Sequence, residues 1–149
     1  YISSYGEGFR ENGGQYTHGA VWLAMSCYVS GLPDSGRQLL EMILPENLDS
    51  ARYQAEPFVL AADVYSATGH EGEAGWSWYT GSAGWYLRAA AECMLGLRLR
   101  RGRLYIDPPA NAPHCRIRWV DFHGAAHNIE YTGRGVLTDG KPYDGGGIG

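Results

Sequence analysis

The order of two hydrophobic patterns along the chain constrains its fold more than any other feature. In the first part, apolar residues recur at helical spacing in four segments, 16–31, 35–44, 57–67 and 82–97. Farther along, alternating or β-forming residues fill three segments, 103–107, 115–122 and 126–133. Helices followed by strands predict a mainly α protein with a C-terminal antiparallel β segment. We expect the seam near 97–102 and therefore two domains, 1–97 and 98–149.

Prolines and glycines mark the ends of the expected helices. Gly31 and Pro33 predict the end of the first helix, Pro45 ends the second, and Pro57 suits the first turn of the third. Four such helices rarely bury all their apolar faces against one another, so we expect two hairpins of a larger helical array. The chain opens at Tyr1 without an initiator methionine, and we expect a fragment of a longer protein. Apolar faces left uncovered in a fragment predict self-association.

Composition argues against several functional classes. The 149 residues include 44% hydrophobic ones, yet no run approaches the about 20 apolar residues of a membrane span. Three widely spaced cysteines give neither a disulfide framework nor a metal site and favour a reducing compartment. Four arginines cluster within 98–103, which could be a nucleic-acid patch or a solvated turn. The net charge of −4 favours the turn and argues against nucleic-acid binding.

Two loops that lead into helices carry the candidate chemistry. In RENGGQYTHGAVW, two adjacent glycines let the backbone approach a ligand closely, and flanking polar side chains can bind a polyhydroxylated molecule: Arg10, Glu11, Asn12 and Gln15. His18 follows in the first helical turn, where free amide groups and the helix dipole favour an anion. WSWYTGSAGW repeats the arrangement with Thr80 and Gly81 beneath three aromatic residues. The two junctions could converge on one oxyanion.

Each of these features also has a plain structural interpretation. Asn-Gly-Gly is a common tight turn, Ser and Thr before helices are usually caps, and tryptophan clusters usually fill cores. A single histidine in a first turn is most often a surface residue. The residues by themselves therefore leave a ligand site and ordinary structure both open.

Long motifs then point to a family. RENGGQYTHGAVW, AEPFVLAADVYS and GWSWYTGSAGWYLRAAAECMLGLR, in this order, resemble the C-terminal catalytic region of the inverting glycoside phosphorylases, the family of cellobiose and chitobiose phosphorylases. Within it, the strings are most similar to the phosphorylase-like domain of the cyclic β-1,2-glucan synthases. The resemblance covers roughly residues 5–107, and the remaining tail is compatible with the family's C-terminal β segment.

The resemblance implies a fold and a reaction. The fold would be the last helical hairpins of an (α/α)6 barrel with part of a C-terminal β-domain. The reaction would be inverting phosphorolysis, or the reverse synthesis, of β-linked glucosides, with β-1,2-glucan as the expected substrate. Inorganic phosphate would be the co-substrate and no cofactor would be needed. Partners would be a β-glucan oligosaccharide and the rest of the parent chain, in the cytoplasm or at the cytoplasmic face of the bacterial inner membrane.

The resemblance also implies residue roles. His18, Thr80 and Gly81 match the phosphate contacts of the family. Tyr5 and Arg10 match acceptor-side sugar contacts, although the disaccharide phosphorylases often have lysine where this chain has Arg10. Glu11, Asn12 and Gln15 share that loop and are expected to bind substrate or support residues that do.

The general acid of the family is an aspartate. No stretch of this sequence resembles the residues that surround that aspartate in the family. Asp63 is expected within a helix and Asp107 at the end of a strand. We therefore expect no catalytic residue in this chain, and an isolated chain without activity. The alternatives are a non-catalytic carbohydrate-binding module, which would use the tryptophan-rich loop without phosphate, and an assembly domain without a ligand.

Overall fold

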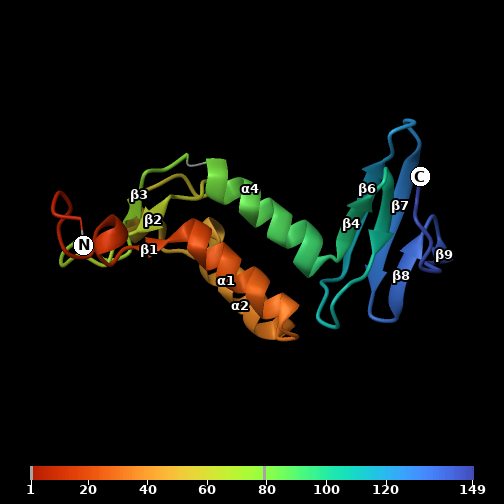
Figure 1. Cartoon of the computed structure of the whole chain (residues 1–149), viewed down its shortest axis with the longest axis horizontal. Helices are drawn as coiled ribbons and strands as arrows, with labels where there is room; N and C mark the ends of the chain where they lie inside the picture. The colour runs from red at the N-terminus through yellow and green to blue at the C-terminus, as the bar shows by residue number, and fades with distance from the viewer. Residues whose placement is uncertain (1, 79) are drawn as a thin grey trace. The chain divides into compact units, whose positions relative to one another are not determined.

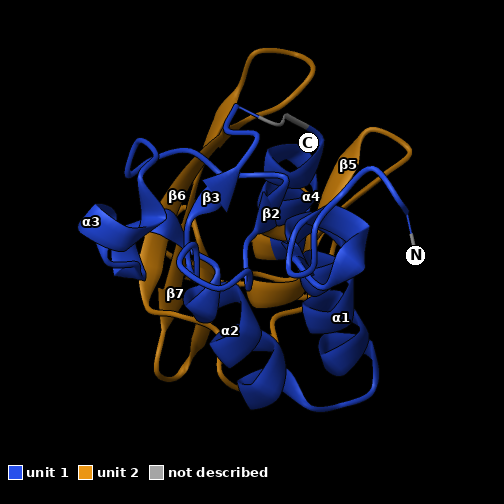
Figure 2. Cartoon of the chain, turned by 90° about the vertical axis from the view of Figure 1, so that its left-hand side faces the viewer, with its two compact units in different colours: residues 1–89 blue, residues 90–149 orange. Residues whose placement is uncertain are grey.

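The computed structural model describes residues 2–78 and 80–149, with the backbone but not the side chain of Thr80. The chain forms two compact units, Tyr1–Ala89 and Ala90–Gly149 (Figures 1 and 2). The domains expected at 1–97 and 98–149 remain a prediction. None of the helices in the described residues is long and apolar enough to cross a bilayer.

Helices and short turns make up most of the regular structure of unit 1. The helices are α1 (Thr17–Val29), α2 (Pro33–Met42), α3 (Ser50–Tyr53) and α4 (Thr80–Ala89). Two single turns, η1 (Arg10–Asn12) and η2 (Pro45–Asn47), precede α1 and follow α2. The helices expected at 16–31 and 35–44 therefore exist with slightly shifted ends.

Helices α1 and α2 form an antiparallel hairpin around a small apolar core. Gly31 makes the turn with φ +76°, and Pro33 occupies the first turn of α2, where its missing N–H costs nothing. Val21 and Leu40 are fully buried between the helices. A Cβ on Gly36 would lie 2.5 Å from the Tyr28 ring, so the absence of a side chain there allows the close packing.

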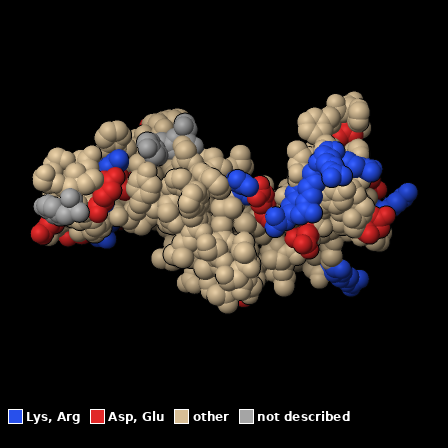
Figure 3. Space-filling model, viewed as in Figure 1, with Lys and Arg blue, Asp and Glu red and all other residues tan. Residues whose placement is uncertain are grey.

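The outer surface of α1 is apolar as well. The helix contains no charged residue, and Trp22, Leu23 and Val29 are 51%, 56% and 85% exposed. Figure 3 shows a broad surface without charged side chains over the helices of unit 1.

The segment expected as a third helix, 57–67, is extended instead. It passes through a turn and enters β2 (Asp63–Val64), the middle strand of an antiparallel sheet with β1 (Gln15–Tyr16) and β3 (Ala74–Gly75). The reason is burial: the five consecutive residues 59–63 are all buried, whereas a surface helix would bury only one face. The backbone of this segment bonds to α1 and β3 and to the Tyr53 hydroxyl, which accepts from Ala61 N and donates to Val59 O.

The expectation of a mainly α protein, with hairpins of an (α/α)6 barrel, is wrong for this structure. The chain is 32% helix and 23% strand, with short helices and three sheets. Besides the segment at 57–67, the helix expected over 82–97 ends early: α4 stops at Ala89, a wider π turn, η3 (Ala90–Met94), follows, and Gly96 at φ +66° leads into a strand.

Unit 2 is built from two antiparallel sheets around one core. A hairpin pairs β4 (Leu97–Arg100) with β5 (Arg103–Ile106). The second sheet is a meander of β6 (Cys115–Val120), β7 (Ala126–Thr132), β8 (Gly135–Thr138) and β9 (Lys141–Pro142). Leu104, Ile106, Ile129 and Tyr131 form the core. The strands expected at 103–107, 115–122 and 126–133 are thus confirmed.

The arginines near the seam lie on the hairpin of unit 2. Arg100 pairs directly with Arg103 across β4 and β5, and both are exposed. Figure 3 shows the basic side chains gathered over this unit.

Candidate functional site

Arg10 and Asp63, 53 positions apart, form the best-defined polar contact in unit 1. The backbone N–H of Arg10 donates to Asp63 Oδ2 at 3.0 Å, and its guanidinium Nη1 donates to Oδ1 at 3.1 Å. The Asp63 side chain is fully buried and that of Arg10 is 13% exposed. One aspartate on the central strand of the sheet therefore fixes both the main chain and the side chain of the loop before α1.

Two glycines leave the room that this contact needs. A Cβ on Gly14 would lie 2.9 Å from Asp63 Oδ2, and one on Gly75 would lie 2.5 Å from Oδ1. Distances this short exclude any side chain at either position without displacing the carboxylate. The second glycine of the Asn-Gly-Gly motif is thus explained by close approach of the backbone to Asp63.

The loop between β3 and α4 contributes aromatic residues to the same place. The Arg10 guanidinium lies 4.6 Å from the centre of the Trp76 ring, within the range of a cation–π interaction. Burial alone would lower the pKa of Arg10, but the charge and hydrogen bond of Asp63 outweigh it and raise that pKa. The guanidinium is therefore firmly cationic.

Backbone strain gathers around this contact. Arg10, Trp76 and Trp78 have φ values of 50°, 58° and 63°, in the left-handed region that favours glycine. Such conformations persist where surrounding contacts impose them, and they are frequent at binding sites. Trp76 and Trp78 are also 62% and 64% exposed, although the Arg10 guanidinium covers one face of the Trp76 ring.

The starts of α1 and α4 are attached to two successive residues of the extended segment. Thr17 N, at the first position of α1, donates to Ala62 O at 2.9 Å. The Ser82 hydroxyl, in the first turn of α4, donates to Ala61 O at 3.4 Å, and Ser82 is fully buried. The two loop-to-helix junctions singled out in the sequence therefore share one anchor, and Figure 1 shows α1 and α4 beginning beside the same sheet.

His18 lies in the first turn of α1 and reaches α4. Its ring stacks on Trp85 of α4, with centroids 5.6 Å apart, and meets the edge of Trp22 at 4.8 Å. Its Nε2 is buried and has no hydrogen-bond partner in the described part of the chain. Arg10 Nε is also buried and has no hydrogen-bond partner among the described residues. Buried polar atoms without partners are uncommon, and they mark places where a ligand can bind.

The second predicted phosphate loop is described only in part. Thr80 begins α4, but its side chain lies outside the described residues. Gly81 is exposed, and a Cβ there would meet no atom of the described residues within 4 Å.

The remaining predicted residues divide between the loop and the far side of the sheet. Asn12 holds the loop together, because its side chain bonds to the backbone of Ile2 and donates to Tyr5 O. Tyr5 is half-buried and Glu11 is exposed. Gln15 pairs with Val64, while the next pair is Tyr16 with Asp63, so Gln15 points to the opposite face from Asp63. The structure thus brings Arg10 close to Tyr5, Glu11 and Asn12 but not to Gln15.

Sequence reasoning missed Asp63 and Trp85. The signal for Asp63 was present: a carboxylate inside the apolar run FVLAADV cannot be buried without a cationic or hydrogen-bonding partner. Trp85 gave no separate signal, because a tryptophan in an apolar helix is indistinguishable from a core residue.

Several known proteins are similar to this chain in sequence. Cyclic beta-(1,2)-glucan synthase NdvB of Rhizobium meliloti (strain 1021) is 39% identical over 136 residues, which is 87% of this chain and 5% of that protein. Solabiose phosphorylase of Paenibacillus borealis is 30% identical over 97% of this chain and 20% of its own length. N,N'-diacetylchitobiose phosphorylase of Vibrio proteolyticus is 23% identical, also over 97% of the chain and 20% of its own length. The chain therefore spans one fifth or less of these relatives.

The profile of one family covers all of unit 1. It is described as the glycosyl hydrolase 94 superfamily, catalytic domain, and it matches residues 1–96. This match and the relatives confirm the resemblance that the motifs suggested. Since well over half of its residues fit that profile, the chain belongs to the glycosyl hydrolase 94 superfamily.

Proposed function

We propose that unit 1 supplies the phosphate-binding side of an enzyme that carries out inverting phosphorolysis, or the reverse synthesis, of β-linked glucosides. β-1,2-Glucan is the proposed substrate class, because the relative that is 39% identical is named as a cyclic β-1,2-glucan synthase. Two phosphorylases among the relatives support phosphate as the co-substrate. The reaction calls for no further cofactor.

The shared anchor of α1 and α4 carries this proposal. Thr17 and Ser82 bond to the successive carbonyls of Ala62 and Ala61, and the His18 ring stacks on Trp85. Each helix N-terminus presents backbone N–H groups and the positive end of a dipole. With the unpartnered His18 Nε2 beside them, they suit a single tetrahedral oxyanion between His18 and the Thr80–Gly81 junction.

The proposed chemistry assigns a simple role to these residues. An oxygen of the bound phosphate attacks the anomeric carbon, the glycosidic C–O bond breaks, and a sugar 1-phosphate of inverted configuration forms. An inverting hydrolase needs a carboxylate base to activate water, whereas phosphate is already an anionic nucleophile. What the protein must supply is alignment of that anion with the anomeric carbon.

The departing oxygen must receive a proton, and we place the general acid outside these 149 residues. Asp63 cannot serve, because both of its oxygens are engaged by Arg10 and its side chain is fully buried. The 149 residues alone are therefore proposed to be inactive, with the rest of a parent chain completing the site. Location in the cytoplasm, or at the cytoplasmic face of the inner membrane, stays part of the same proposal.

Sugar binding is proposed for the loop around Arg10. Tyr5, Arg10 and Glu11 offer polar groups beside the exposed ring of Trp76, which can stack on a pyranose. Asn12 acts by holding this loop in shape, as its hydrogen bonds indicate. Gln15 stays a prediction, since it points to the other face of the sheet.

The test is a His18→Ala variant of the full-length protein that carries this chain. Phosphate consumption with β-1,2-gluco-oligosaccharides would be followed over a range of phosphate concentrations. Loss of a hydrogen bond to a charged ligand costs about 1.5–3 kcal/mol, so we expect the KM for phosphate to rise about tenfold or more. The KM for the oligosaccharide should change much less.

His123→Ala is the matched control. His123 is exposed in a turn of unit 2, so its removal should leave both KM values unchanged. An unchanged phosphate KM in His18→Ala would contradict the proposal. Saturable sugar binding that is indifferent to phosphate would favour a carbohydrate-binding module instead.

A further inference from the structure

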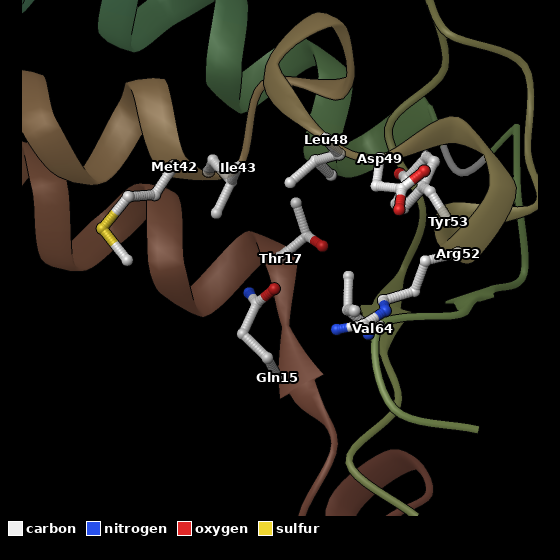
Figure 4. A pocket seen from close by; sticks show the side chains of 10 residues that line it. Gln15, Thr17, Met42, Ile43, Leu48, Asp49, Arg52, Tyr53 and Val64 are labelled. Carbon is white, nitrogen blue, oxygen red and sulfur yellow. The ribbon is translucent and has the colours of Figure 1, made fainter. Parts of the chain in front are cut away.

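A cavity lies on the face of the three-stranded sheet opposite to Asp63. Its volume is about 160 Å³, and its wall is formed by the start of α1, the end of α2, the segment around α3 and β2 (Figure 4). Gln15 and Val64 point into it, whereas Asp63 and Tyr16 point to the opposite face. The cavity is therefore separate from the Arg10–Asp63 contact.

The side chain of a buried threonine faces this cavity. Thr17 is 2% exposed and lines the wall, and Figure 4 shows its side chain pointing into the space between Leu48 and Val64. The backbone N–H of Thr17 donates to Ala62 O, and no side-chain hydrogen bond of the described residues involves the Thr17 hydroxyl. That hydroxyl can therefore bond to a polar group placed in the cavity.

A cation lies at the same wall. The aliphatic part of the Arg52 side chain packs over Gly72, where a Cβ would lie only 2.5 Å from Arg52 Cδ. This close approach directs the guanidinium toward Gln15 and Val64 (Figure 4). Within the described residues, no ion pair or hydrogen bond engages the Arg52 side chain, and the nearby Asp49 carboxylate accepts from Ala51 N instead.

Most of the remaining wall is apolar, apart from Tyr53 and the Asp49 carboxylate, which accepts a hydrogen bond from Ala51 N. Met42, Ile43 and Leu48 lie across from the polar groups, with Val64 beside them. A ligand that fits must therefore combine a hydrogen-bonding anionic head with a short apolar tail. Arg52, the Gln15 amide and the Thr17 hydroxyl suit a carboxylate, because all three can donate to its oxygens.

We propose that this cavity binds a short aliphatic carboxylate, with its head on Arg52, Thr17 and Gln15 and its tail on Met42, Ile43 and Leu48. The site is independent of the proposed phosphate chemistry. Thr17 belongs to both regions, because its backbone N–H donates to the Ala62 carbonyl at the start of α1 while its hydroxyl faces the cavity.

The test uses butyrate as the probe and the full-length protein, at constant ionic strength, with binding followed by calorimetry and by ligand-observed NMR. A ligand this small makes few contacts, so we expect a dissociation constant in the millimolar range. We expect saturable binding of butyrate and none of butylammonium, which has the same tail and the opposite charge. Arg52→Gln should weaken binding about tenfold, and the near-isosteric Thr17→Val severalfold, as expected for lost hydrogen bonds to a charged group.

Arg101→Gln is the matched control, because Arg101 is exposed in the hairpin of unit 2. This substitution should leave butyrate binding unchanged. Arg52→Lys, which keeps the charge, should bind between the wild type and Arg52→Gln and gives a second measurement should Arg52→Gln fold poorly. Absence of saturable butyrate binding would overturn the proposal. Equal binding by wild type, Arg52→Gln and Thr17→Val would overturn it as well, and so would butylammonium binding as tightly as butyrate.

Discussion

At the scale of single residues, Asp63 determines the conformation of the loop that precedes α1. A fully buried carboxylate needs compensation for its lost hydration, and Arg10 provides it through both a backbone N–H and a guanidinium. In return, the contact imposes a left-handed conformation on Arg10 itself. The Arg10–Asp63 contact therefore shapes the same loop that carries the proposed sugar contacts.

We predict that Asp63→Asn destabilises the protein by about 3 kcal/mol, since it leaves the largely buried Arg10 cation without its countercharge. Denaturant unfolding measures the loss directly. Glu7→Gln, which removes a carboxylate charge from an exposed position, is the control and should cost almost nothing. If both variants lost the same small amount, the Arg10–Asp63 contact would not support the loop.

Single residues were also where sequence reasoning both succeeded and failed. The glycine pair at 13–14 and the first-turn position of His18 were recognised as unusual, because glycine and helix-start chemistry are local properties. The Arg10–Asp63 contact could not be recognised, since it joins residues 53 positions apart and depends on a strand that local pattern did not indicate. The roles of His18, Thr80 and Gly81 remain predictions.

At the scale of elements, prediction worked where one face is buried and failed where burial is continuous. Helices α1 and α2 and strands β5, β6 and β7 carry periodic patterns or clear breaks and lie where they were expected. Residues 59–63 are buried on every side, so the apolar run contains no period that would distinguish a helix from an extended segment. The π turn after α4 likewise has no local signature in AAECM.

Two helix glycines test the packing of elements. Gly36→Ala should destabilise the α1–α2 hairpin by about 1–3 kcal/mol, because its Cβ would lie 2.5 Å from the Tyr28 ring and 2.9 Å from Ala24 O. Gly84→Ala in α4 should be neutral or stabilise by up to about 1 kcal/mol, since no atom of the described residues lies within 4 Å of its Cβ and alanine favours helix. Thermal unfolding of the two variants gives the comparison, and an equal effect at both positions would contradict the packing described for α2.

At the scale of the whole molecule, the chain consists of two units with separate cores. Val21, Ala24 and Leu40 lie in unit 1, and Leu104, Ile106, Ile129 and Tyr131 form the core of unit 2. The family profile ends at residue 96, inside the early part of unit 2. The match to solabiose phosphorylase covers 97% of the chain and therefore extends through most of unit 2 as well.

Separate cores predict separate unfolding. Ile129→Ala should destabilise unit 2 by about 2–5 kcal/mol through a cavity in its core. Hydrogen exchange should then show lost amide protection in β6, β7 and β8, while α1 and α2 keep theirs. Leu40→Ala should give the reciprocal result, and loss of protection in both units from either variant would show that they unfold as one.

The anchoring of two helices on Ala61 and Ala62 has a consequence for how this protein can vary. The distance between the starts of α1 and α4 is set by two main-chain carbonyls one residue apart. It does not depend on the methyl side chains of the same residues. Exchange of either alanine for another small residue leaves that spacing alone. An insertion or deletion of one residue there would shift one origin against the other by about 3.3 Å, the rise of an extended chain. The number of residues between the two carbonyls, and not the identity of their side chains, therefore sets the distance between the starts of α1 and α4.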